Sequence, residues 1–120
     1  MVKLIYKNKI ILPDLKYVRN IFGLVGGLMF ASKEKVKKGM CLVMLGKSDK
    51  KFGVGIHMFF CFYPYDVLFI NSDFRVVDKK ILTPWSSSYT PKKPVKYIIE
   101  SWKGTFKDIN IGDKIQIKHP

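Results

Sequence analysis

The chain has 120 residues and a formal net charge of +13, and 48% of its residues are hydrophobic. This length and apolar content predict a single domain over residues 1–120 with its own core, and they exclude an intrinsically disordered chain. The first residues lack the apolar region of a signal peptide, and no run reaches the roughly 18 apolar residues of a membrane-spanning helix. We therefore expect a soluble, cytoplasmic monomer with no membrane partner.

The N-terminal third predicts a strand pair followed by helical segments. Val2–Tyr6 and Ile10–Leu12 alternate around the polar turn Lys7–Lys9, which is typical of a hairpin. A helix is expected next, with Asp14 as its N-cap and apolar residues at helical spacing, namely Leu15, Val18 and Phe22. Ser32 is expected to cap one further turn of helix, which Gly39 ends in a left-handed conformation.

The central third predicts strands. Met40–Leu45 is a continuous apolar run of strand length, which is typical of an interior strand covered on both faces. Gly53–Phe62 is expected to form the next strand, with a bend at its glycines. Val67–Ile70 and Arg75–Leu82 are expected to pair as a hairpin across an Asx turn that begins at Asn71.

The last third predicts one helix and a closing strand. Thr83–Pro94 contains three prolines and is expected to be irregular. Val95–Trp102 shows i, i+3, i+4, i+7 apolar spacing, which favours a short helix, and Lys114–Lys118 alternates as a strand. The chain as a whole is therefore predicted to be mainly β (α+β), as a compact barrel or sandwich-like domain with one or two short helices.

Cysteine and histidine usage favours no metal site and no cofactor. Cys41 and Cys61 both lie in apolar runs, where free thiols behave as small hydrophobic side chains, although the sequence leaves open whether the two pair. His57 and Cys61 are four residues apart on an expected strand, hence about 13 Å apart, which is too far to bind one ion together.

Several short motifs follow one another in a specific order. They are Gly27-Leu28-Met29, Gly39-Met40, Met58, Pro64-Tyr65-Asp66, Val76-Val77, Pro84, Tyr97 to Glu100 with Gly104, and Gly112-Asp113. This set resembles an uncharacterised prokaryotic family, domain of unknown function 192. The resemblance implies a small, mainly β domain and carries over no catalytic residue.

The main functional hypothesis is a non-catalytic module that binds a glycan or a small molecule in an aromatic-lined groove. Aromatic rings beside polar groups can stack a sugar or a base and orient it. The residues expected to line this groove are His57, Tyr63, Tyr65, Asp66, Trp85 and Tyr89.

Two other functions remain open. All basic residues except Arg19 and Arg75 are lysines, so a lysine-rich surface that binds nucleic acid or another polyanion is the first alternative. A hydrolase is the second alternative, using Asp66 with His57 or paired with Glu100 or Asp113. The bland interpretation is that Asp66 accepts backbone amides, Glu100 pairs with a lysine on a helix surface, and Asp113 forms the closing turn.

Overall fold

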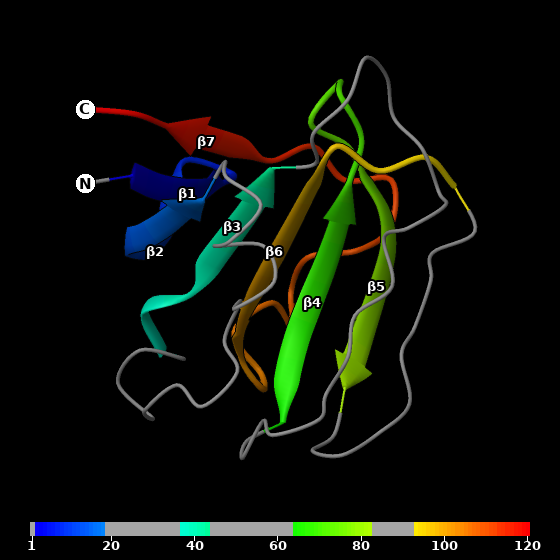
Figure 1. Cartoon of the computed structure of the whole chain (residues 1–120), viewed down its shortest axis with the longest axis horizontal. Helices are drawn as coiled ribbons and strands as arrows, with labels where there is room; N and C mark the ends of the chain where they lie inside the picture. The colour runs from blue at the N-terminus through cyan, green and yellow to red at the C-terminus, as the bar shows by residue number, and fades with distance from the viewer. Residues whose placement is uncertain (1, 19–36, 44–63, 83–92) are drawn as a thin grey trace.

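The computed structural model describes residues 2–18, 37–43, 64–82 and 93–120, and its strands form one seven-stranded sheet (Figure 1). The strands are β1 (Val2–Tyr6), β2 (Lys9–Val18), β3 (Met40–Val43), β4 (Tyr65–Ile70), β5 (Val76–Leu82), β6 (Tyr97–Trp102) and β7 (Gln116–Lys118). Their order in the sheet is β5-β4-β6-β3-β2-β1-β7. Strands β2 and β3 run parallel, whereas the other neighbouring strands run antiparallel. The predicted mainly β fold is therefore confirmed.

The sheet curls into a half-barrel because its two ends approach each other. Arg75, just before β5, forms an antiparallel bridge with Lys114, just before β7. The Val76 N–H donates to the Asp113 carbonyl at 2.9 Å, and the Ile115 N–H donates to the Phe74 carbonyl at 2.9 Å. We call this meeting of the 74–76 and 112–115 segments the seam.

The hydrophobic core fills the concave side of the curled sheet. It unites residues from the strands with residues of the 103–113 segment, which passes behind β4 in Figure 1. Its buried members are Leu4, Tyr6, Leu12, Leu15, Cys41, Leu68, Ile70, Val76, Ile99, Phe106, Ile109 and Ile115. Cys41 is a free thiol, as predicted, and burial raises its pKa to about 12, so the thiol stays protonated and packs as an apolar group.

Both predicted hairpins are confirmed. Strands β1 and β2 pair across the Lys7–Asn8 turn, and β4 pairs with β5. The Asn71 side-chain oxygen accepts the N–H groups of Asp73 and Arg75, each at 3.0 Å, as expected for an Asx turn.

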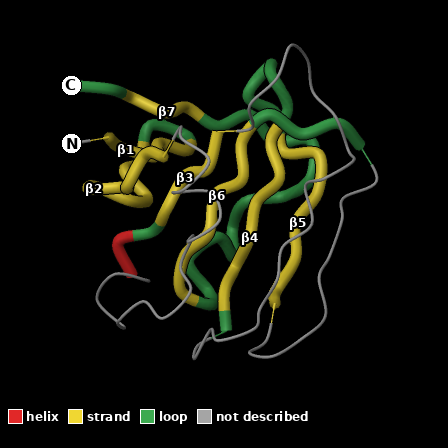
Figure 2. The backbone as a smooth tube through the Cα atoms, in the orientation of Figure 1, coloured by secondary structure: helices red, strands yellow, loops and turns green. Residues whose placement is uncertain are grey.

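The predicted helix end at Gly39 is also confirmed. Lys37 and Lys38 are the only helical residues in the described part of the chain and lead into β3 (Figure 2). Gly39 has a φ of +82°, and a Cβ at this position would lie 2.7 Å from Leu12 Cδ1. Both the left-handed backbone and the close approach therefore require glycine.

The helix predicted to begin at Asp14 is wrong over its described residues, because Leu15–Val18 continue β2. Pro13 suggested a break, but β1 pairs Leu4 with Leu12 and Val2 with Leu15, which leaves an extra residue in β2 at this point. In such a bulge the N–H that proline lacks is not needed for the ladder.

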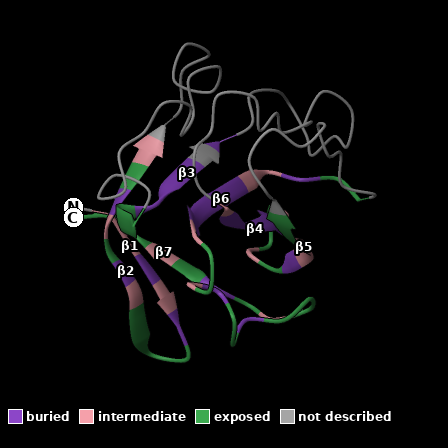
Figure 3. Ribbon diagram, turned by 90° about the horizontal axis from the view of Figure 1, so that it is seen from below, coloured by how far each residue is buried: buried purple, intermediate pink, exposed green. Residues whose placement is uncertain are grey.

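The helix predicted over Val95–Trp102 is wrong as well. Tyr97–Trp102 form β6, which lies between β3 and β4 and pairs with both. Ile98 and Ile99 are both buried, although adjacent residues of a strand point to opposite faces. A strand covered on both faces has apolar residues at helical spacings by chance, and Figure 3 shows β3, β4 and β6 largely buried.

The strand predicted over Gly53–Phe62 and most of the irregular stretch Thr83–Pro94 lie outside the described residues. The predicted strand Lys114–Lys118 is confirmed for the last three of its residues, which form β7. None of the helical residues that the structure describes forms a helix long and apolar enough to cross a membrane.

Candidate ligand-binding site

The residues of the predicted aromatic groove fall into two groups. Tyr65 and Asp66 begin β4 and are 1% and 2% exposed. Because they are neighbours on a strand, their side chains point to opposite faces of the sheet. His57, Tyr63, Trp85 and Tyr89 lie outside the described residues, so the groove as a whole stays a prediction.

The side chains of Asp66 and Lys79 both form hydrogen bonds to the backbone of the 106–109 segment. Asp66 Oδ2 accepts the Phe106 N–H at 3.0 Å, and Lys79 Nζ donates to the carbonyls of Phe106 at 2.6 Å and Ile109 at 2.7 Å. A carboxylate thus accepts from the N–H of Phe106, and an ammonium group donates to the carbonyl of the same residue, whose ring is fully buried. We call this arrangement of Asp66, Lys79 and Phe106 the buried clamp, and it matches the structural role expected for Asp66.

Glu100 is buried rather than paired with a lysine on a helix surface, so that expectation is wrong. Its cross-strand neighbours are Met40 and Val67, and burial raises its pKa to about 7. Asp66 lies opposite Ser101, so Asp66 and Glu100 point to opposite faces and do not form a carboxyl pair. In the described ranges, no three His, Cys, Asp or Glu side chains converge as metal ligands would.

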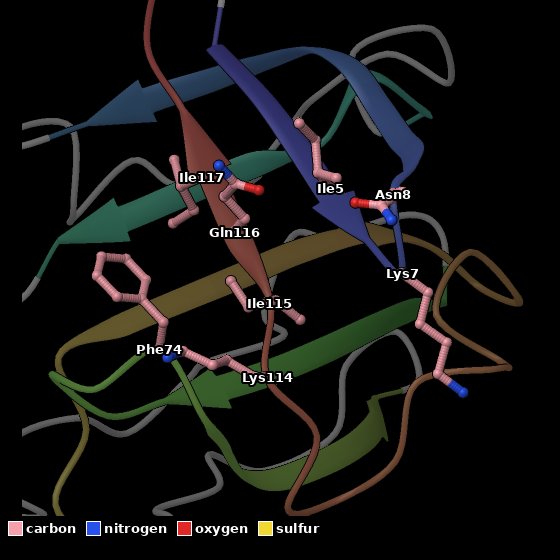
Figure 4. A pocket seen from close by; sticks show the side chains of 8 residues that line it. All are labelled: Ile5, Lys7, Asn8, Phe74, Lys114, Ile115, Gln116 and Ile117. Atoms are coloured by element: carbon pink, nitrogen blue, oxygen red, sulfur yellow. The ribbon is translucent and has the colours of Figure 1, made fainter.

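A pocket of about 400 Å³ lies at the seam (Figure 4). Ligand sites usually measure about 300–1,000 Å³ and combine apolar walls with a few polar groups. This seam pocket is lined by Ile5, Lys7, Asn8, Phe74, Lys114, Ile115, Gln116 and Ile117. Figure 4 shows that β1 and its following turn form one side, Phe74 the other, and the 114–117 segment the part between them.

The backbone around the seam pocket is held by many hydrogen bonds. Besides the two that join the sheet ends, the Gly112 N–H donates to the Val76 carbonyl at 2.7 Å. The Arg75 side chain donates to the Gly112 carbonyl at 3.1 Å. The pocket is therefore formed before any ligand arrives, which lowers the entropy lost on binding.

Three lining residues adopt a backbone conformation that side chains other than glycine rarely take. Lys7, Asn8 and Phe74 have φ values of 49°, 63° and 61°, and they are the only non-glycine residues with positive φ in the part of the chain that the structure describes. All three line the same pocket. A two-residue hairpin turn requires positive φ at both of its residues, so Lys7 and Asn8 are explained by the turn, and Phe74 is the residue whose backbone conformation is unusual.

A hydrogen bond between Tyr6 and Asp113 joins the residues that precede the two lysines of the pocket lining. The Tyr6 hydroxyl donates to Asp113 Oδ2 at 2.5 Å, and the Asn110 N–H donates to the same oxygen at 2.9 Å. The Tyr6 bond raises the pKa of Tyr6 and lowers that of Asp113. Because Tyr6 precedes Lys7 and Asp113 precedes Lys114, this bond links the residues next to both lysines. The closing turn predicted for Asp113 is confirmed.

The sequence hypotheses missed this pocket. Its lining comes from segments that were interpreted only as the Lys7–Lys9 turn, the Asn71 turn and the closing strand. One signal was available, since Phe74 follows an Asx turn where glycine is the usual residue. Nothing in the sequence indicates that these three segments meet, because the bridge joins Arg75 to Lys114 across the whole sheet.

The described residues thus define a small curled-sheet protein with a preformed, lysine-flanked pocket. The chain belongs to the DUF192 family, whose model, described as "Uncharacterized ACR", matches residues 11–117. A UPF0127 protein of Pyrococcus furiosus is 30% identical over 112 residues, with 92% of this chain and 91% of that protein covered. A UPF0127 protein of Pyrococcus horikoshii is 39% identical over 92 residues, with 75% of each covered. The resemblance seen in the sequence motifs is confirmed.

Two solved structures share the fold. A protein of unknown function from Novosphingobium aromaticivorans matches with a TM-score of 0.79 and 19% identity, over 96% of this chain and 82% of that one. A Sinorhizobium meliloti protein, named as a candidate transcription regulator, matches with a TM-score of 0.77 and 22% identity, over 97% of this chain and 91% of that one. At these identities the likeness establishes the fold alone.

Proposed function

We propose that this protein is a non-catalytic binding module that holds a small ligand in the seam pocket. The observation that carries the proposal is a preformed pocket of about 400 Å³ whose lining joins Phe74, at an unusual positive φ, to lysine, amide and isoleucine side chains. The aromatic groove predicted around Trp85 is a second location for the same function. The seam pocket is preferred because described residues build all of its lining.

The chemistry of the lining supports binding rather than catalysis. Its eight side chains supply two ammonium groups, two amides, one aromatic ring and three isoleucines. Amides and ammonium groups orient a ligand through hydrogen bonds and charge, whereas nucleophilic catalysis needs a nucleophile within reach of a base. The apolar members, Ile5, Ile115 and Ile117, offer a surface for the uncharged part of a ligand.

The direct test is a fragment screen followed by amide nitrogen–proton NMR, using small molecules that are aliphatic or aromatic and neutral or charged. Binding in the seam pocket should shift the amides of Lys7, Asn8, Phe74 and the 114–117 segment. A screen in which no fragment shifts these amides contradicts the proposed site.

A matched pair of variants separates this site from a general polyanion surface. Lys114→Gln removes a charge at the pocket, while Lys103→Gln removes the same charge from an exposed lysine that does not line it. A pocket ligand should lose affinity only with Lys114→Gln. If nucleic acid binds instead, with equal losses for both variants and a steep dependence on salt, the lysine-rich alternative is favoured.

A further inference from the structure

We propose, on the basis of the proposed function, that the ligand is a planar aromatic ring that carries one carboxylate or phosphate group. The ring would lie against Phe74, and the anionic group would face the ammonium group of Lys114, which Figure 4 shows on the Phe74 side of the pocket. Four observations on the lining lead to this class of ligand.

The Phe74 ring is held as a stacking surface. One of its faces stacks on Tyr97, with ring centroids 5.1 Å apart and planes 19° apart. Since Phe74 also lines the pocket, the rest of its ring is available to a ligand. A ring already fixed by one stack can accept a second planar group without losing further side-chain freedom.

Phe74 stands at a backbone position that locally favours glycine. Glycine adopts a φ of 61° without strain, whereas a bulky residue there is an outlier. The turn itself is already closed by Asn71, whose side chain accepts the N–H groups of Asp73 and Arg75. The turn therefore does not need phenylalanine, whose ring packs on Tyr97 and against the core while also lining the pocket.

The charges of the pocket are both positive and come from two different segments. Lys7 follows β1, and its Nζ lies 5.2 Å from the centre of the Tyr6 ring, while Lys114 precedes β7. The nearby Asp113 carboxylate is occupied by Tyr6 and Asn110. Figure 4 shows Lys114 extending toward Phe74 and Lys7 pointing away from it, so an anionic group beside the ligand's ring is the complement of Lys114.

The type of cation decides how selective the anion site is. Lysine acts as a point charge, whereas arginine forms a planar fork that matches an anion in a bidentate way. The neighbouring Arg75 uses its guanidinium on the Gly112 carbonyl. The pocket thus selects for negative charge rather than for anion geometry, and both a carboxylate and a phosphate fit.

Adenosine monophosphate and indole-3-acetate are the probes for this proposal, because each joins a planar ring to one of the two anionic groups. Adenosine supplies a ring without the anion, and ribose 5-phosphate supplies the anion without an aromatic ring. By NMR titration, one or both ring-and-anion probes should bind about tenfold more tightly than either partial probe, since stacking on an aromatic side chain contributes on this scale. Phenyl phosphate and benzoate, which carry the same ring, then show whether phosphate or carboxylate is the preferred anion.

Variants at Phe74 test the ring directly. Phe74→Gly removes the ring at a backbone position that glycine favours, and it should lower the affinity of the ring-and-anion probes about tenfold without changing that of ribose 5-phosphate. Phe74→Tyr keeps the ring and should retain the affinity. Lys114→Gln should weaken adenosine monophosphate, indole-3-acetate and ribose 5-phosphate about threefold and leave adenosine unchanged, as expected for an exposed charge pair, and Lys7→Gln is the matched control.

The outcomes distinguish this inference from the proposed function. If ribose 5-phosphate binds as well as adenosine monophosphate and Phe74→Gly has no effect, the aromatic ligand is ruled out while the pocket remains a binding site. If the fragment screen finds only neutral or aliphatic molecules in the pocket, the inference fails alone. If no molecule shifts the pocket amides, both fail.

Discussion

Asp66 and Glu100 are buried and Lys79 is half-buried, whereas Lys7 and Lys114 are exposed at the seam pocket. In the buried clamp, Asp66 and Lys79 are bonded to the backbone around Phe106, and Glu100 is enclosed by strand neighbours. At the seam, both lysines are exposed, but Lys7 Nζ lies over the Tyr6 ring, whereas Lys114 extends toward Phe74 (Figure 4). The comparison teaches that Asp66 and Lys79 are committed to the backbone and that Glu100 is costly to ionise, while Lys114 at the seam remains available to a ligand.

Ionisation of the Glu100 side chain, as the pH rises, should cause the largest change in the stability of the fold. Its pKa rises from the usual 4.5 to about 7 on folding, so the folded protein keeps a proton that the unfolded chain releases. Stability should therefore be unaffected by this group below pH 4.5, fall as the pH rises to 7, and level off above it. At about 1.4 kcal/mol for each pKa unit, the loss amounts to about 3 kcal/mol.

Denaturant unfolding of the wild type and of Glu100→Gln between pH 4 and pH 8 measures this effect, because the difference between the two curves isolates Glu100. The variant should gain stability relative to the wild type as the pH rises. Parallel curves would show that Glu100 ionises in the folded protein as freely as in the unfolded chain.

Asp66 should give the next largest effect. Asp66→Ala leaves the buried Phe106 N–H without its acceptor, which should destabilise the protein by about 1–3 kcal/mol. Thermal and denaturant unfolding measure this loss, and Asp108→Ala, at an exposed carboxylate, is the control. An unchanged midpoint for Asp66→Ala would show that the clamp does not stabilise the fold and would return Asp66 to the list of ligand-binding candidates.

The seam lysines should give the smallest effect on stability. Lys7→Gln and Lys114→Gln should each change the unfolding free energy by less than about 0.5 kcal/mol, as exposed substitutions usually do. Lys114→Gln should in addition weaken ligand binding at the seam pocket, whereas Lys7→Gln should leave it unchanged. Melting curves that show a loss comparable to that of Asp66→Ala would remove the distinction between the two regions.

The sequence predicted local features wherever the cause was itself local. Gly39 was expected to have a left-handed backbone, and Asn71 was expected to close a turn through its side chain; both expectations depend only on neighbouring residues. The two helix predictions failed because the strands that replaced the helices are stabilised by pairing with segments distant in the sequence. Leu15–Val18 became a strand through pairing with β1 and β3, and Tyr97–Trp102 became one through pairing with β3 and β4.

For the candidate sites, too, the sequence showed the single unusual residue but not its distant partners. Asp66 stood out in the sequence as a charge within an apolar run, and its acceptor role follows from the need to satisfy a buried carboxylate. Its donor, Phe106, is forty residues away and could not be named in advance. The seam pocket was missed because Lys7, Phe74 and Lys114 are ordinary turn residues when each is viewed alone.

The sequence by itself determined the strand-rich composition, the turns and the family, because apolar alternation, glycine and asparagine act over a few residues. Only the tertiary structure decided the order of the strands, the burial of Glu100 and the meeting of Arg75 with Lys114. These features arise from contacts between distant segments, which form when the curled sheet buries its concave face around Phe106. The seam pocket is a product of that closure, since its lining comes from both ends of the sheet.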